Sequence, residues 1–184
     1  MAVWAIVLIV VGALFVLYAV MTYNRLVTLK NRVKEAWAQI DVQLRRRYDL
    51  IPNLVNTVKG YAEHERAIFE KVAEARSAAI AAKGVPEQAQ AENQITQALR
   101  QLFAVVENYP NLKANENFLS LQEELTGTEG RIAFARQFYN DQVRSWNTLI
   151  QQFPPVVIAR LRGDTPEEYF EVEEAATGPV QVQF

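Results

Sequence analysis

The chain contains no cysteine and a single histidine, His64, among its 184 residues. Without thiols it can form no disulfide framework, no thiolate metal site, no cysteine nucleophile and no lipidated-cysteine anchor. A single histidine is too few for most histidine-based metal sites, and it makes most hydrolytic triads unlikely. These classes of function are therefore disfavoured before any motif is considered.

Charge is missing from the first 24 residues, although 22% of the whole chain is charged. Residues 2–21 are continuously apolar, and as a helix they would be ~30 Å long, which matches the hydrocarbon thickness of a bilayer. A cleaved signal peptide is the alternative, but it would have a basic n-region, a shorter apolar core and a small-residue cleavage site. We expect residues 1–23 to be an uncleaved transmembrane anchor.

Basic side chains follow the apolar run at once, in the order Arg25, Lys30, Arg32 and Lys34. The positive-inside rule therefore predicts a single-pass topology with the N-terminus outside and the C-terminal body in the cytoplasm. If the segment is helical, these four residues lie within ~20 Å of the end of the span. We expect them to face anionic lipid headgroups, so membrane lipids are a predicted partner.

The body carries apolar residues at steps of three and four, the pattern of helices packed against helices as in a coiled coil. The fold class predicted is all-α, with the transmembrane helix continuing into an elongated antiparallel bundle of three to four long helices. Pro52 removes one backbone donor from the first seam, so we expect a kink there. The seams are Leu26, Leu29, Val33, Trp37, Ile40, Leu44, Tyr48, Ile51, Val55, Val58 and Tyr61; Ile68, Phe69, Val72, Ala75 and Ala79; Ile95, Leu99, Leu102, Phe103 and Val106; Phe118, Leu121, Leu125, Ile132, Ala135, Tyr139, Val143, Trp146 and Ile150.

Proline and glycine predict where the bundle is interrupted. Pro86 is expected in the first turn of a helix, residues 109–115 are expected to form a loop, and Pro154 follows the end of the last seam. Gly127 and Gly130 weaken the last seam locally or let a neighbouring helix approach closely. The bundle is predicted over residues 24–162.

The C-terminal part, residues 163–184, is predicted to contain a short acidic helix followed by a flexible tail. Asp164, Pro166 and Glu167 have the types and order of a cap, a first-turn proline and an acidic first turn, so the helix is expected to run through Tyr169 and Phe170.

Charge is sorted along the chain, since residues 25–83 carry a net charge of +5 and residues 84–184 a net charge of −7. The densest basic cluster is Arg45, Arg46 and Arg47, which fan around a helix and lie ~37 Å beyond Met21, too far to anchor lipid. We expect one or two of these arginines to pair with acids such as Glu129 or Asp141 on a neighbouring helix. The cluster is too small to predict nucleic-acid binding in an acidic chain.

Asn140 and Asn147 lie beside the aromatic seam residues Tyr139 and Trp146, one heptad apart. Buried asparagines lower stability but select helix register and oligomeric state. We therefore predict that these four residues set helix register or subunit contacts, and that the chain forms a homo-oligomer.

Motifs for catalysis are not found, and we expect no catalytic, cofactor-binding or metal-binding residues. His64 precedes Glu65, but Ile68 occupies the position where a zinc protease motif requires its second histidine, so a solvated helical histidine is the simpler interpretation. Glu123 and Glu124 are interpreted as a solvated helix face.

Two strings of residues are too long and unusual to follow from helix periodicity. They are RRYDLIPNLV at residues 46–55 and YPNLKANENFLSLQEEL at residues 109–125. With EYFEVEE at residues 168–174, they resemble the LemA family of bacterial membrane proteins, and the resemblance covers about residues 23–171. Trp146-Asn147 departs from the Tyr-Asn of many members but keeps an aromatic ring beside the amide.

The resemblance implies a single N-terminal anchor in the bacterial inner membrane and an elongated helical core without established catalytic residues. A magnetosome-associated branch of the family implies membrane organisation, and frequent gene neighbourhood with membrane proteases implies quality control. The leading interpretation is a non-catalytic, membrane-anchored helical scaffold that self-associates and organises or supports membrane-protein complexes. An adaptor or regulatory subunit of a membrane protease or stress-response system is the alternative, and a hydrolase a distant one.

Overall fold

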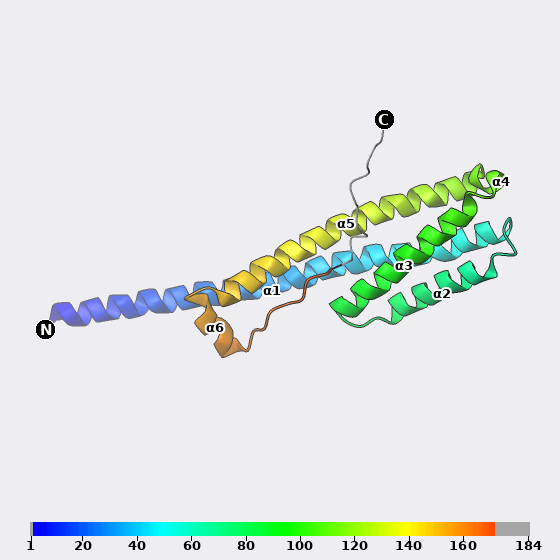
Figure 1. Cartoon of the computed structure of the whole chain (residues 1–184). Coiled ribbons are helices and arrows are strands. Elements are labelled where there is room, and N and C mark those ends of the chain that lie inside the picture. The colour runs from blue at the N-terminus through cyan, green and yellow to red at the C-terminus, as the bar shows by residue number, and fades with distance from the viewer. Residues whose placement is uncertain (1, 172–184) are drawn as a thin grey trace, which may run out of the picture. The chain divides into compact units, whose positions relative to one another are not determined.

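The chain is all-α over the residues that the computed structural model describes, 2–171 (Figure 1). Antiparallel helix packing is found within each of two compact units, so the predicted fold class is confirmed. Of the described residues, the first unit contains 2–40 and 137–168, and the second contains 41–136 and 169–171. The helices are α1 (Ala2–Lys59), α2 (Arg66–Ala81), α3 (Val85–Val106), α4 (Pro110–Lys113), α5 (Glu116–Gln151) and α6 (Pro155–Arg162).

Helix α1 is continuous for 58 residues, from the apolar segment into the first seam. Within residues 2–171 it is the one helix long and apolar enough to cross a membrane, and none of its most apolar 18-residue stretch is buried. A core helix of similar composition would cover its apolar side chains with neighbours. The exposed apolar segment therefore indicates a single membrane anchor, and its predicted continuation into the bundle is confirmed.

The first unit packs α1 against α5. The rings of Trp37 and Tyr139 meet edge to face with centroids 5.4 Å apart, and Lys30 lies over the ring of Trp146 at 4.9 Å. Rising numbers on α1 meet falling numbers on α5, so the two helices run antiparallel. The seam residues that this packing buries include Leu26, Val33, Ile40, Tyr139, Val143, Trp146 and Ile150.

The second unit packs the later part of α1 with α2, α3, α4 and the first part of α5. Helix α2 packs against α3 after the turn at Gly84, which has a φ of 80° and so suits glycine. Pro86 lies in the first turn of α3, as predicted. The seam residues buried here include Leu44, Ile51, Val58, Phe69, Val72, Ile95, Leu99, Leu102, Phe118, Leu125 and Ile132.

Two predicted boundaries between elements are wrong. The first seam was expected to reach Tyr61, but α1 ends at Lys59, and Tyr61 is exposed in the turn before α2. Residues 109–115 were expected to form a loop, but Pro110 begins the short helix α4. A proline cannot continue the preceding helix, yet its missing N–H costs nothing in a first turn, so it starts a new one.

The predicted acidic helix through Tyr169 and Phe170 is also wrong, because residues 164–171 form no helix. The backbone of residues 165–168 is instead hydrogen-bonded to side chains of α5. These lateral bonds use groups that helix formation would require. The predicted tail, residues 175–184, lies outside the residues that the structure describes.

Helix α5 runs unbroken through Gly127 and Gly130. A Cβ atom built on either glycine would meet nothing within 4 Å, so close helix approach does not explain them within the described part of the chain. The local weakening of helix propensity is the interpretation that is left.

Candidate functional site

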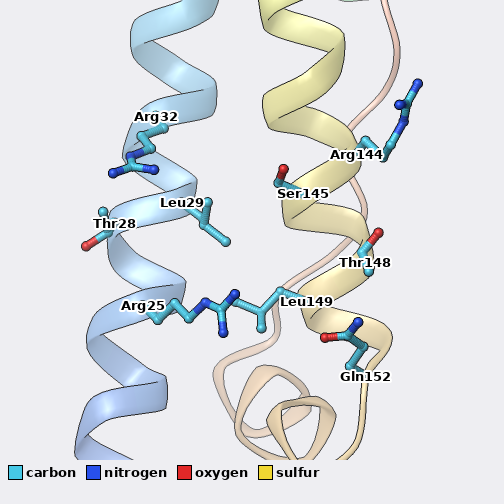
Figure 2. Close-up of a pocket in the computed structure, with 9 residues that line it drawn as sticks. All are labelled: Arg25, Thr28, Leu29, Arg32, Arg144, Ser145, Thr148, Leu149 and Gln152. Atoms are coloured by element: carbon cyan, nitrogen blue, oxygen red, sulfur yellow. The ribbon is translucent and has the colours of Figure 1, made fainter.

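A basic groove of about 660 Å³ lies between α1 and α5 in the first unit, just after the apolar segment ends. Figure 2 shows Arg25 extending toward Leu149 of α5, while the side chain of Arg144 points away from α1. The Arg32 side chain lies over α1 and does not extend toward α5 (Figure 2), so Arg25 is the cation directed into the groove. None of the described lining residues is acidic. Guanidinium groups donate hydrogen bonds to phosphate and carboxylate oxygens, so the groove suits an anionic group. Its lining residues are Arg25, Thr28, Leu29, Arg32, Arg144, Ser145, Thr148, Leu149 and Gln152.

The four predicted lipid-facing residues do not share one environment. Arg25 and Arg32 line the basic groove, and Lys34 is exposed. Lys30 instead pairs with Glu167 and lies over the Trp146 ring, so the structure directs it to protein groups. Lipid contact stays a prediction for the set.

Three α5 side chains predicted to set register hold the extended segment of residues 165–168. The indole nitrogen of Trp146 donates to the Thr165 carbonyl at 3.0 Å, and the Tyr139 hydroxyl donates to the Glu168 carbonyl at 2.9 Å. The Asn147 amide donates to the Glu167 carbonyl at 2.9 Å and accepts from the Glu167 N–H at 2.8 Å. We call this arrangement the α5 clamp. We did not predict from the sequence that these side chains would hold residues 165–168.

The α5 clamp is mostly dry. Tyr139 and Trp146 are buried, and Asn147 is half-buried. Burial, with the Glu167 and Glu168 carboxylates adding to it, raises the pKa of Tyr139 to about 12. The phenol therefore stays protonated and keeps its donor role. Asn140, one heptad earlier, is half-buried and engaged, and its role in register or oligomer contacts stays a prediction.

The basic cluster divides sharply in the second unit. Arg47 is buried and pairs with Glu92 at 2.7 Å and with Glu129 at 2.8 Å, so the predicted pairing with Glu129 is confirmed. Arg46 lies 3.9 Å from Glu124, and Arg45 pairs with Asp41 on its own helix at 2.9 Å. Asp141, the other predicted partner, instead lies 3.8 Å from Arg144.

Glu92 is the centre of a buried polar network on α1 and α3. Its carboxylate accepts from Arg47, from the Tyr48 hydroxyl and from the Gln88 amide, the last at 3.1 Å. Arg47 also donates to the Thr96 hydroxyl at 3.0 Å. A buried charge that is paired and hydrogen-bonded in this way is a structural group.

Two pKa shifts follow from this setting. Burial, reinforced by the Glu92 carboxylate, raises the pKa of Tyr48 well above its usual range, so the phenol remains a donor. Burial also raises the pKa of Glu129, and the Arg47 guanidinium opposes that shift. Tyr48 therefore holds the Glu92 carboxylate, and Glu129 pairs with Arg47.

Pro52 leaves one carbonyl group on α1 without its helical donor, and α2 supplies a replacement. The missing N–H of Pro52 would have bonded to the Tyr48 carbonyl, four residues earlier. The Nε of Arg76 donates to that carbonyl at 2.8 Å. Helix α1 consequently continues through Pro52 to Lys59, and the kink stays a prediction.

Arg76→Met is expected to lower the free energy of unfolding by about 1–2 kcal/mol, because it leaves the Tyr48 carbonyl unsatisfied. In a Pro52→Ala background the N–H of residue 52 can serve that carbonyl, so Arg76→Met should then have a smaller effect. Urea unfolding of the full chain in mild detergent, followed by circular dichroism, measures both. Equal losses in the two backgrounds would contradict this assignment.

Candidate catalytic groups remain scattered. His64 is exposed in the turn between α1 and α2, so the expectation of a helical histidine is wrong. Glu123 and Glu124 are exposed on α5. Among residues 2–171, no group of three or more His, Asp or Glu side chains could hold a metal ion.

Comparison with known proteins identifies relatives of this chain. Residues 36–184 match the model of the LemA family. Magnetosome proteins MamQ 2 and MamQ 1 of Paramagnetospirillum magneticum AMB-1 are each 27% identical over 192 residues, covering 90% of this chain and 71% of the relative. Magnetosome protein MamQ of Magnetospirillum gryphiswaldense MSR-1 is 26% identical with the same coverage. The predicted resemblance is confirmed.

Proposed function

This chain belongs to the LemA family, and we propose that it is a non-catalytic, membrane-anchored scaffold that self-associates and organises membrane-protein complexes. The observation that carries the proposal is that the buried charged side chains pair with each other. Arg47 and Glu92 bind each other inside the second unit. Their ion pair joins α1 to α3, which suits a structural protein.

The relatives support a role at membranes. Their names associate MamQ with magnetosomes, and on this distant similarity we propose membrane organisation as the function class of this chain. The basic groove after the apolar segment supports a topology with the body in the cytoplasm of a bacterium and the N-terminus outside. Arg25 and Arg32 would then meet anionic lipid headgroups.

Mass photometry of the full chain in mild detergent tests self-association. We expect particles that contain more than one copy, and a strict monomer would overturn the scaffold. Asn140→Leu should change the number of copies, whereas Gln137→Ala, at an exposed position three residues earlier on α5, should not. An unchanged assembly in Asn140→Leu would remove this residue from the subunit contacts.

Co-purification from a native membrane distinguishes the scaffold from its alternative. A homo-oligomer isolated without other proteins supports the scaffold. A membrane protease recovered in fixed ratio with the chain would favour an adaptor or regulatory subunit instead.

A further inference from the structure

Helix α6 exposes an apolar face that nothing in the described chain covers. Phe153, just before the helix, is 82% exposed, Val157 is 51% exposed and Leu161 is 84% exposed. Val157 and Leu161 are four positions apart in α6, so they share one face of the helix, and Phe153 lies in the turn that precedes it. Pro155 and Ala159, on the opposite face, are buried. The helix therefore turns small side chains toward the protein and large apolar ones outward, the reverse of an ordinary surface helix.

The C-terminal end of α6 is attached to α1 where the apolar segment ends. The Arg162 guanidinium lies over the Tyr23 ring at 4.7 Å and donates to the Tyr23 carbonyl at 3.4 Å. Tyr23 is two residues beyond Met21, ~3 Å along a helix. This end of α6 is consequently level with the polar boundary of the predicted span.

The N-terminal end of α6 is at the same level. It follows α5 after three residues, and the last turns of α5 contribute Leu149 and Gln152 to the basic groove that Arg25 also lines. Arg25 is four residues beyond Met21. One end of α6 contacts Tyr23, and the other follows the end of α5 that lines the groove with Arg25. The exposed face of α6 therefore lies within a few ångströms of the headgroup layer whenever the apolar segment spans a bilayer.

The charge around this face suits an anionic membrane. Arg160 and Arg162 occupy the last turn of α6, and Arg25 and Arg32 are on the neighbouring groove. Arg162 pairs with Asp164 at 3.1 Å, so Arg160 is the cation of α6 that we assign to lipid. A helix with large apolar residues on one side and arginines at its margin is typical of segments that lie in the plane of the interface.

We propose that α6 is an interfacial helix, whose exposed Val157 and Leu161, together with Phe153 in the preceding turn, enter the headgroup region of the bilayer that α1 spans, while Arg160 binds anionic lipid phosphates. This second membrane contact goes beyond the scaffold, since it needs no self-association. The interfacial helix rests on one part of the proposed function, namely that the apolar segment of α1 anchors the chain in a membrane. Fixing the chain at two points would limit tilting and rotation of the bundle about the single span.

Single-cysteine labelling of the full chain tests the proposal cleanly, because the natural sequence contains no cysteine. Val157→Cys and Leu161→Cys carry an environment-sensitive fluorophore in phosphatidylcholine–phosphatidylglycerol vesicles that contain a shallow nitroxide lipid. Gln39→Cys is the matched control, exposed on α1 and ~24 Å beyond Tyr23. We expect blue-shifted emission and about two-fold or greater quenching at 157 and 161 relative to 39.

Lipid composition and a second variant sharpen the outcome. Replacing phosphatidylglycerol by phosphatidylcholine should weaken quenching at Leu161→Cys, and Arg160→Gln should remove most of that dependence. Quenching independent of anionic lipid would overturn the role of Arg160.

Three results would overturn the interfacial helix. One is quenching at 157 and 161 that does not exceed quenching at 39. Another is shielding of both labels from aqueous iodide without quenching by lipid, which would mean that a protein covers the face. A label at Val11→Cys, in the middle of the predicted span, that a deep nitroxide lipid fails to quench would overturn the anchor itself, so the two failures are distinguishable.

Discussion

Arg47→Met is expected to lower the free energy of unfolding by about 3–5 kcal/mol, because it leaves a buried carboxylate without its cation. The Glu92 side chain is 3% exposed and receives the Arg47 Nη1 at 2.7 Å. Tyr48 and Gln88 would still donate to the carboxylate, but neither carries a charge. Urea unfolding of the full chain in mild detergent, followed by circular dichroism, measures the loss.

Arg45→Met is the matched control, since it removes the same side chain two residues earlier. Arg45 is 74% exposed and pairs with Asp41 one turn away, so its loss should cost at most about 0.5 kcal/mol. Equal effects at positions 45 and 47 would contradict the buried network.

The double variant Arg47→Met/Glu92→Met separates pairing from packing. Removing both charges leaves no fully buried ion unpaired, since the remaining partner of Arg47, Glu129, is 41% exposed. We therefore expect the double variant to lose less stability than the two single variants together. Additive losses would show that Arg47 and Glu92 contribute independently.

The positions of the helices were predictable because periodicity records burial. Val33, Ile40, Leu99 and Val143 recur at helical spacing, and all four are buried as predicted. Side chains at steps of three and four must share a face, whatever the partner helix is. The ends of helices were less predictable, because Gly60 and Pro110 permit more than one local conformation.

The spacing of the apolar residues indicates which of the three clustered arginines is buried, although the pattern of charges alone does not. Position 47 is three residues after Leu44 and four before Ile51, so it lies on the buried seam. Glu92 is likewise three residues before Ile95 on α3. A charged residue in register with a seam predicts a buried ion pair, but which opposite charge it meets depends on how distant helices align.

The extended course of residues 164–168 had no local signal. Asp164, Pro166 and Glu167 have the chemistry of a helix start, and the α5 clamp overrides it. Trp146 and Asn147 are about twenty residues away along the chain. The segment does not follow its local helix propensity, because several buried hydrogen bonds to α5 stabilise it more than one turn of helix would.

Asn147→Leu is expected to release residues 164–168 from α5 and to lower the free energy of opening this segment by about 2–3 kcal/mol, since two backbone groups lose their partners. If buried asparagines only lower stability, as the sequence analysis assumes, leucine at position 147 should give a more stable protein. The structure reverses the expected sign, because the amide holds both the N–H and the carbonyl of Glu167.

Hydrogen exchange of the peptide that contains residues 164–171 measures the release as faster exchange. Asn147→Asp can still accept from the Glu167 N–H but can no longer donate to its carbonyl, so it should give a smaller acceleration. Ser145→Ala is the control, because that hydroxyl donates to the Asp141 carbonyl within α5 and does not reach the segment. Unchanged exchange in Asn147→Leu would mean that Tyr139 and Trp146 suffice to hold the segment, and the register role predicted for Asn147 would then have to be sought between subunits.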